Sequence, residues 1–266
     1  FFSFSQIMEA VVIVLDVGST MCGKGGRFND AITAVKHLIQ HKLIFKPKDH
    51  VALVLFGTEE TNNALSNQGY EHISVFRELE PTNPEFLRSI ANIQPGRQVG
   101  DFVDALIVGM DMLIRHVNEI GKKRIQKRIF LVTDGGCPVD ADDLNIVLDQ
   151  FNKMSAKLNV IGVGFEQSLS RQMSTSDDDE AVVGSSSTAP PSSSSMTTTT
   201  TTTNTTTTSS NQKQFVRSAI KQKNEQLLHQ IATQVKGVVV PVTQALEMMT
   251  AFRSRGVLQR TTYRGG

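Results

Sequence analysis

The chain has 266 residues, of which 39% are hydrophobic and 20% charged, and its formal net charge is +1. This length suggests one domain or two with an ordinary core; no apolar run is long enough to cross a bilayer, and the opening FFSFSQIMEA resembles neither a signal peptide nor an anchor. The small net charge argues against nucleic-acid binding by the surface as a whole, and two cysteines form no disulfide framework, so we expect a reducing compartment.

Five short runs rich in β-branched residues alternate with helical patterns along the chain. Each run is apolar on both faces, which is typical of a strand covered on both sides of a sheet. The runs are 11–15, 51–56, 129–133, 160–164 and 238–240. Strands that alternate with helices predict an α/β fold with a doubly wound, mostly parallel sheet and helices on both faces. The strand order expected for this winding is 3-2-1-4-5.

Apolar residues at helical spacing mark the helices between these strands. The stripes run over Phe28–Ile39, Phe102–Val117 and Leu144–Leu158. We expect the first helix to begin around residues 28–29, and the second to span residues 101–117.

The segment 167–212 begins with acidic residues and continues with serine and a long threonine tract. Such a composition cannot bury enough apolar area to offset the entropy lost on ordering. We therefore predict a disordered insertion inside a domain that spans 7–254. After the insertion, 215–236 is expected to be helical. GVVVP should form an edge strand stopped by its proline, and a last helix should cover 242–252.

The stretch VVIVLDVGSTMCGKGG, residues 11–26, can be interpreted as a nucleotide loop or as a metal loop. From Gly18 it spells G-S-T-M-C-G-K-G, one residue short of the phosphate-binding pattern G-x-x-x-x-G-K-[ST]. Gly25 stands where that pattern has the hydroxyl that binds Mg²⁺, and Gly26 stands where the helix should already have begun. These two departures argue against nucleotide binding.

The metal interpretation depends on Asp16 and Asp134, which follow the first and fourth strands. The carboxyl ends of these strands meet where the winding of the sheet reverses, a usual place for ligands. D-V-G-S-T is close to the D-x-S-x-S of von Willebrand A-type metal sites, but Gly18 lacks the hydroxyl and only Thr20 remains in register. We expect no metal and no cofactor, with both aspartates accepting backbone N–H groups of the turns that follow.

No other catalytic pattern stands out. The six histidines are scattered without H-E-x-x-H, and no G-x-S-x-G precedes a helix. We therefore expect a protein that is not an enzyme. The residues leave a metal-dependent adhesion-type A domain and a nucleotide-binding ATPase as alternatives.

Three longer segments are specific enough to compare with a known family. They are VALVLFGTEETNNALSNQGYEHISV (51–75), IQPGRQVGDFVDALIVGMDML (93–113) and IGKKRIQKRIFLVTD (120–134). They closely resemble the amino-terminal domain of the large subunit of the Ku heterodimer, and QRTTYRGG at 259–266 is also similar to that family. The resemblance implies a von Willebrand A-like domain and, at 255–266, the start of the family's β-barrel.

The resemblance also implies a role in DNA double-strand-break repair by non-homologous end joining and in telomere maintenance, in the nucleus and away from membranes. In Ku the partners are the small subunit, DNA ends held by the β-barrel, the catalytic subunit of the DNA-dependent protein kinase, and end-joining factors with short apolar and basic motifs. Because the barrel begins near the end of this chain, the expected DNA contacts are Arg253, Arg255, Arg260 and Arg264.

The helix expected at 101–117 carries a second apolar row beside its core stripe. The row is Val103, Ile107, Met110 and Ile114, at spacings of four, three and four. A helix that is apolar on two faces is either sandwiched or leaves a groove for another chain.

In the Ku family a pocket beside the loop after FGT receives short apolar and basic motifs. By resemblance, Leu65, Tyr70, Ile107 and Met110 should line it, with Asp104 available for a basic partner residue. Ordinary burial in the core is the alternative for the apolar side chains.

Overall fold

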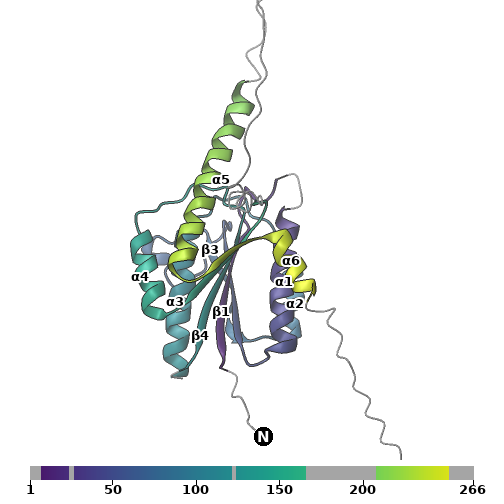
Figure 1. The fold of residues 1–266 in the computed structure, drawn as a ribbon, viewed down its shortest axis with the longest axis vertical. Helices are drawn as coiled ribbons and strands as arrows, with labels where there is room; N and C mark the ends of the chain where they lie inside the picture. The colour runs from purple at the N-terminus through teal and green to yellow at the C-terminus, as the bar shows by residue number, and fades with distance from the viewer. Residues whose placement is uncertain (1–6, 24–26, 122–123, 166–207, 252–266) are drawn as a thin grey trace, which may run out of the picture.

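The computed structural model describes residues 7–23, 27–121, 124–165 and 208–251, which form one sheet covered by helices (Figure 1). The strands are β1 (Glu9–Asp16), β2 (His50–Phe56), β3 (Ile73–Pro81), β4 (Gln126–Thr133), β5 (Lys157–Gly162) and β6 (Val238–Pro241). Their order, β3-β2-β1-β4-β5-β6, contains the predicted order 3-2-1-4-5 with β6 added beside β5, and GVVVP lies at one edge, as expected.

Neighbouring strands are parallel except β2 and β3, which are antiparallel. β3 was not among the predicted apolar runs. Its sequence ISVFRELEP carries three charged residues, and only Ile73 and Leu79 are buried. An edge strand that is half exposed lacks the continuous apolar pattern of a strand covered on both faces.

Helices cover both faces of the sheet (Figure 1). One face carries α3 (Phe102–Ile120), α4 (Leu144–Met154) and α5 (Thr208–Gln234). The other face carries α1 (Arg27–Phe45), α2 (Pro84–Ser89) and α6 (Val242–Ala251). Short 3-10 turns lie at Ser66–Gln68 and Ile90–Asn92. Because side chains of a strand alternate between faces, Val12 and Val14 of β1 join the core under α3, whereas Ile13 and Leu15 join the core under α1.

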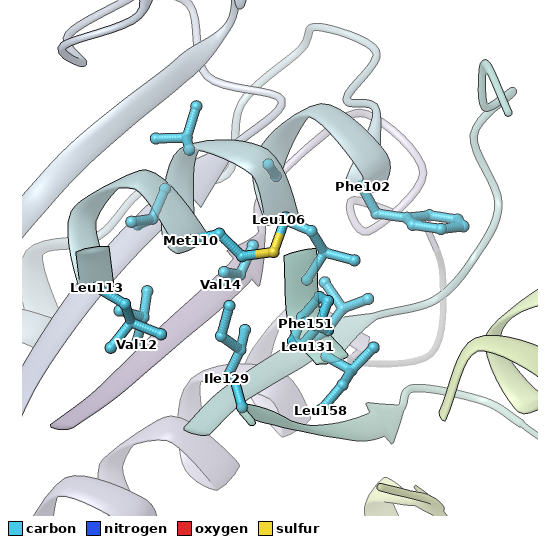
Figure 2. Packing of buried hydrophobic residues seen from close by; sticks show 14 of the residues in the cluster. Val12, Val14, Phe102, Leu106, Met110, Leu113, Ile129, Leu131, Phe151 and Leu158 are labelled. Atoms are coloured by element: carbon cyan, nitrogen blue, oxygen red, sulfur yellow. The ribbon is translucent and has the colours of Figure 1, made fainter. Parts of the chain in front are cut away.

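α3 confirms the predicted core stripe. The Asp101 side chain caps its amino terminus by accepting the N–H of Val103 at 2.7 Å. Gly121, in the left-handed conformation with φ of 62°, ends the helix three residues after the expected end. Leu106, Met110 and Leu113 of the stripe point toward β1 and β4 (Figure 2), and Phe102 is buried in the same core.

The predicted boundary between α4 and β5 was wrong. Ser155 has φ of 51° and ψ of 36°, so it ends α4 directly after Met154. Leu158, which was assigned to the helical stripe, lies in β5 and is fully buried. β5 also ends at Gly162, two residues before the expected end.

Two further boundaries differ from the sequence interpretation. α1 begins at Arg27, close to the expected start, whereas α5 begins at Thr208 instead of 215. The rest of the predicted insertion, 167–207, lies outside the described residues, as does the predicted start of a β-barrel at 255–266.

Candidate functional site

The first candidate site is the crevice where the winding of the sheet reverses. Asp16 ends β1 and Asp134 directly follows β4, and the two side chains are close enough for their charges to interact, as the strand order predicted. Both residues are buried, with exposed fractions of 1% and 0%. Buried carboxylates require donors or positive charge nearby.

Both carboxylate oxygens of Asp16 accept hydrogen bonds from the protein. The N–H of Gly18 donates to Oδ1 at 2.9 Å, and the hydroxyl of Thr133 donates to Oδ2 at 2.6 Å. Burial raises the pKa of Asp16 to about 7. The hydrogen bond from Thr133 lowers this pKa, whereas the negative charge of Asp134 raises it further.

Asp134 is held by three groups of the protein. Oδ1 accepts the hydroxyl of Thr20 and the N–H of Gly136, both at 2.9 Å. Oδ2 lies 3.1 Å from Nη1 of Arg27, the first residue of α1. The prediction that Asp16 and Asp134 accept backbone N–H groups of the following turns is therefore confirmed.

Gly18 leaves no room for the side chain that a metal site would need there. A Cβ atom at this position would lie 2.9 Å from the carbonyl oxygen of Gln98 and 3.2 Å from Oδ1 of Asp16. Because the carboxylate oxygens of Asp16 and Asp134 already accept protein donors, the residues present do not fit a divalent metal. Within the described ranges, no three His, Cys, Asp or Glu residues gather as a metal site would require.

α5 closes the crevice from the side, which the sequence interpretation did not foresee. The side-chain amide of Asn224 donates to the carbonyl oxygens of Gly135 at 2.9 Å and Cys137 at 2.6 Å. Nζ of Lys221 donates to the carbonyl of Val163 at 3.1 Å and lies 5.3 Å from the ring centroid of Phe165. These contacts join residues far apart in sequence, so no local pattern could reveal them.

The second candidate site is the surface formed by α3 and the loop between β2 and β3. Asn63 shapes this loop: its amide nitrogen donates to the carbonyls of Tyr70 at 3.0 Å and Ile73 at 2.8 Å, and its amide oxygen accepts the N–H of Leu65 at 2.8 Å. Leu65, Tyr70 and Ile107 are half-buried and pack against the core under α3. We call these three residues the docking surface.

Only part of the second apolar row of α3 reaches this surface. Met110 is 3% exposed and Val103 is 1% exposed, because both turn toward the core of the sheet, as Figure 2 shows for Met110. Ile107 and Ile114 remain half-exposed. Met110 therefore packs as a core residue, and the expectation that it lines a pocket is corrected.

Four carboxyl groups gather beside the docking surface. They are Asp101, Asp104, Asp140 and Asp143, and we call them the acidic patch. Burial, and then the charges of the other three, raise the pKa of Asp104 to about 6. Burial and the charges of Asp104 and Asp143 also raise the pKa of Tyr70. In the part of the chain that the structure describes, no cation forms an ion pair with these four groups.

Hydrogen bonds from backbone N–H groups to carboxylate oxygens hold the patch together, at the N-cap of α3 and in the segment before α4. Oδ2 of Asp101 accepts the N–H of Asp140 at 2.7 Å, and Oδ1 of Asp140 accepts the N–H of Asp142 at 3.0 Å. The sequence predicted a role for Asp104 but not for the other three. Asp140 and Asp143 lie 36 and 39 positions further along the chain, so no local pattern joins them to Asp104.

The predicted DNA contacts Arg253, Arg255, Arg260 and Arg264 lie outside the described residues. None of the helices that the structure describes combines the length and the apolarity needed to span a bilayer.

Comparisons with known proteins agree with one another. A family model described as the Ku70/Ku80 N-terminal alpha/beta domain matches residues 10–182. The chain is 40% identical to "X-ray repair cross-complementing protein 5" of Dictyostelium discoideum over 97% of this chain and 29% of the relative. It is 35% identical to "ATP-dependent DNA helicase 2 subunit KU80" of Arabidopsis thaliana over 64% of this chain and 24% of the relative.

Among solved structures, the chain is similar to the crystal structure of the SpRpn10 VWA domain, with a TM-score of 0.46, 19% identity, and coverage of 62% of this chain and 79% of that one. The chain spans less than a third of the length of the two curated relatives, at 29% and 24%.

Proposed function

Because the chain belongs to the family of the Ku70/Ku80 N-terminal alpha/beta domain, we propose that it is the docking domain of a Ku large subunit that acts in DNA repair. The match at residues 10–182 covers more than half of the chain. The Dictyostelium relative is similar over 97% of the chain, and its name refers to the repair of damage by X-rays.

The activity of the whole protein follows from this assignment. We infer that it pairs with the small subunit of Ku, holds DNA ends through a β-barrel, and acts in the nucleus in non-homologous end joining and telomere maintenance. The catalytic subunit of the DNA-dependent protein kinase and other end-joining factors are the expected partners. The family match and the names of the relatives support the assignment to a Ku subunit and to DNA repair. The telomere role, the nuclear location and the kinase partner depend on the resemblance to the Ku family alone.

The domain itself is proposed to be non-catalytic. The carboxylate oxygens of Asp16 and Asp134 accept hydrogen bonds from threonine hydroxyls, from the Arg27 guanidinium and from backbone N–H groups. These oxygens are therefore not available as ligands for a catalytic cation. The name of the Arabidopsis relative refers to an ATP-dependent helicase. In this chain Gly25 occupies the position where a nucleotide loop carries its metal-binding hydroxyl, which argues against the same activity here.

The observation that carries the docking proposal is an apolar surface beside four carboxyl groups that form no ion pair with any cation among the described residues. Leu65, Tyr70 and Ile107 offer partly exposed apolar area, and the acidic patch lies beside Tyr70. Aromatic and apolar anchors supply most of the affinity of such interfaces, and charge complementarity selects the partner. A short peptide with an apolar anchor and basic residues fits both features.

Fluorescence polarisation with a labelled peptide that carries one Trp, two Leu and several Lys or Arg residues tests this proposal. Ile107→Glu and Tyr70→Ala should each weaken binding by about tenfold or more, since each removes anchor contacts. Val238→Glu is the matched control, because Val238 is 52% exposed on the edge strand β6, away from this surface. Unchanged affinity in both docking variants would rule the surface out.

A further inference from the structure

An apolar groove lies on the opposite face of the sheet from the docking surface, between α1 and α6. Its volume is about 420 Å³. Phe130, Ile161 and Val240 of β4, β5 and β6 line the groove from the sheet, and Leu38 and Met249 line it from the two helices. α1 has 19 residues, and the described part of α6 has 10.

Exposed apolar side chains gather at this groove. The described part of the chain leaves seven large hydrophobic residues more than half exposed, and four of them line the groove. They are Ile44 at 57%, Phe45 at 55%, Val238 at 52% and Met248 at 52%, contributed by α1, β6 and α6. Single exposed apolar residues are common, but their convergence from three elements on one groove marks an interaction surface.

The charged residues around the groove are mainly positive. The lining includes the cations Lys42, Lys46 and Arg128 and a single carboxylate, Glu9. Glu9 pairs with both Lys42 and Arg128, the latter at 2.6 Å, and the buried Asp49 also pairs with Lys42, at 2.8 Å. Lys46 is the lining cation outside these ion pairs. Lys157, exposed at the start of β5, lies beside Arg128 in the ladder between β4 and β5 and adds a further positive charge at this end. A partner that approaches this mouth meets an excess of positive charge, which favours carboxylates.

We propose that this groove binds a segment of a partner protein that presents two or three large apolar side chains flanked by Asp or Glu. A volume of about 420 Å³ lies within the range of pockets that hold side chains or small ligands. The charge preference is opposite to that of the docking surface beside the acidic patch. The two faces therefore select different partners and can bind them at the same time.

Two labelled peptides of about 14 residues test the proposal. Both carry apolar residues at i, i+3, i+4 and i+7, and the remaining positions are mainly Glu in one and mainly Lys in the other. In fluorescence polarisation with the Ile107→Glu variant of the 266-residue chain, in which the docking surface is disabled, the Glu peptide should bind about tenfold more tightly than the Lys peptide. Val238→Glu and Ile44→Glu should each weaken its binding by about tenfold, whereas Ile107→Glu on the docking surface should leave it unchanged.

Methyl NMR locates the peptide independently. The Met248 and Met249 methyl signals should shift on addition of the Glu peptide, and that of the core residue Met110 should not. Equal binding of the two peptides to the Ile107→Glu variant overturns the proposal, and so does binding of the Glu peptide that is unchanged by Val238→Glu. So does self-association abolished by Val238→Glu, which assigns the groove to a second copy. A last outcome concerns the full-length protein. If it does not bind the Glu peptide, and its Met248 and Met249 methyl signals differ from those of the 266-residue chain before any peptide is added, then another part of the same chain fills the groove. That result also overturns the proposal.

Discussion

Nη1 of Arg27 lies 3.1 Å from Oδ2 of Asp134, although 107 residues separate the two in sequence. The Asp134 side chain is 1% exposed, whereas 40% of the Arg27 side chain is open to solvent. A buried carboxylate is costly without a partner. Arg27 and the Thr20 hydroxyl therefore stabilise the buried negative charge of Asp134, as a bound cation does in an A-type domain that holds a metal.

Mg²⁺ is expected not to bind this crevice with micromolar affinity, either in the parent chain or in Arg27→Ala. Removing the guanidinium frees one oxygen of Asp134, but Gly18 still offers no hydroxyl and Mg²⁺ gives up its waters reluctantly. Isothermal titration calorimetry with Mg²⁺ and Mn²⁺ measures this directly. Micromolar binding to the parent chain that disappears in Asp134→Ala would contradict the prediction.

Asp16 should make the domain less stable as the pH rises toward neutrality. Its folded-state pKa of about 7 exceeds the ordinary value of 3.8, so the folded state holds the proton more tightly. The free energy of unfolding should therefore fall between about pH 4 and pH 7, by at most about 4 kcal/mol, and level off above.

Urea unfolding of the parent chain and of Asp16→Asn across this range tests the assignment. The Asn variant cannot ionise, so its curve should lack this fall. The stability of the parent chain relative to the variant should therefore fall as the pH rises. Parallel curves for the two proteins would show that Asp16 does not titrate in this window.

Binding of a basic peptide at the docking surface should weaken in acid. Asp104 has a pKa raised to about 6, so its carboxylate loses its charge as the pH falls through this value. The dissociation constant of the Lys- and Arg-bearing peptide should therefore rise between about pH 7.5 and pH 5.5. Polarisation titrations with Asp104→Asn should show a flatter pH profile. Identical profiles would remove Asp104 from the interface.

Lys42 should be important for stability because it pairs with two nearly buried carboxylates. It contacts Glu9 and lies 2.8 Å from Oδ2 of Asp49, and the three side chains are at most 12% exposed. Lys42→Met leaves these carboxylates without their shared cation, which should cost about 3–5 kcal/mol. The exposed Lys48→Met is the control and should stay within about 0.5 kcal/mol. Chemical denaturation distinguishes these values.

The stability of Met110→Ala tests whether Met110 packs in the core or lines a partner-binding pocket, as the sequence predicted. In the core, the loss of the side chain opens a cavity and should cost about 2–5 kcal/mol. Met248→Ala, at an exposed position, should change stability by less than about 0.5 kcal/mol. If Met110→Ala unfolds at the same denaturant concentration as the parent chain, then Met110 does not pack as the structure places it.

Features with a regular local pattern could be predicted from the sequence. The alternation of apolar strands and helices gave the strand order, and the residue types around Asp16 and Asp134 indicated capping rather than metal binding. β3 lacked the buried pattern because it is an edge strand. The continued helical spacing to Leu158 concealed the left-handed residue at Ser155 that ends α4.

Long-range contacts could not be predicted in this way. The pairing of Arg27 with Asp134 and the gathering of the acidic patch join side chains from segments that meet only in the folded chain. The row on α3 showed two possible faces, and only packing against β1 and β4 decided that Met110 is buried while Ile107 is not.

The contacts of α5 with the crevice have a practical consequence for engineering. Phe165 is buried where the chain leaves β5, and Lys221 and Asn224 fasten the returning helix to Val163, Gly135 and Cys137. The attachment points on both sides of residues 166–207 are therefore set by the folded body itself. A fluorescent reporter or affinity tag inserted between these attachment points should therefore leave the packing of the sheet and its helices intact.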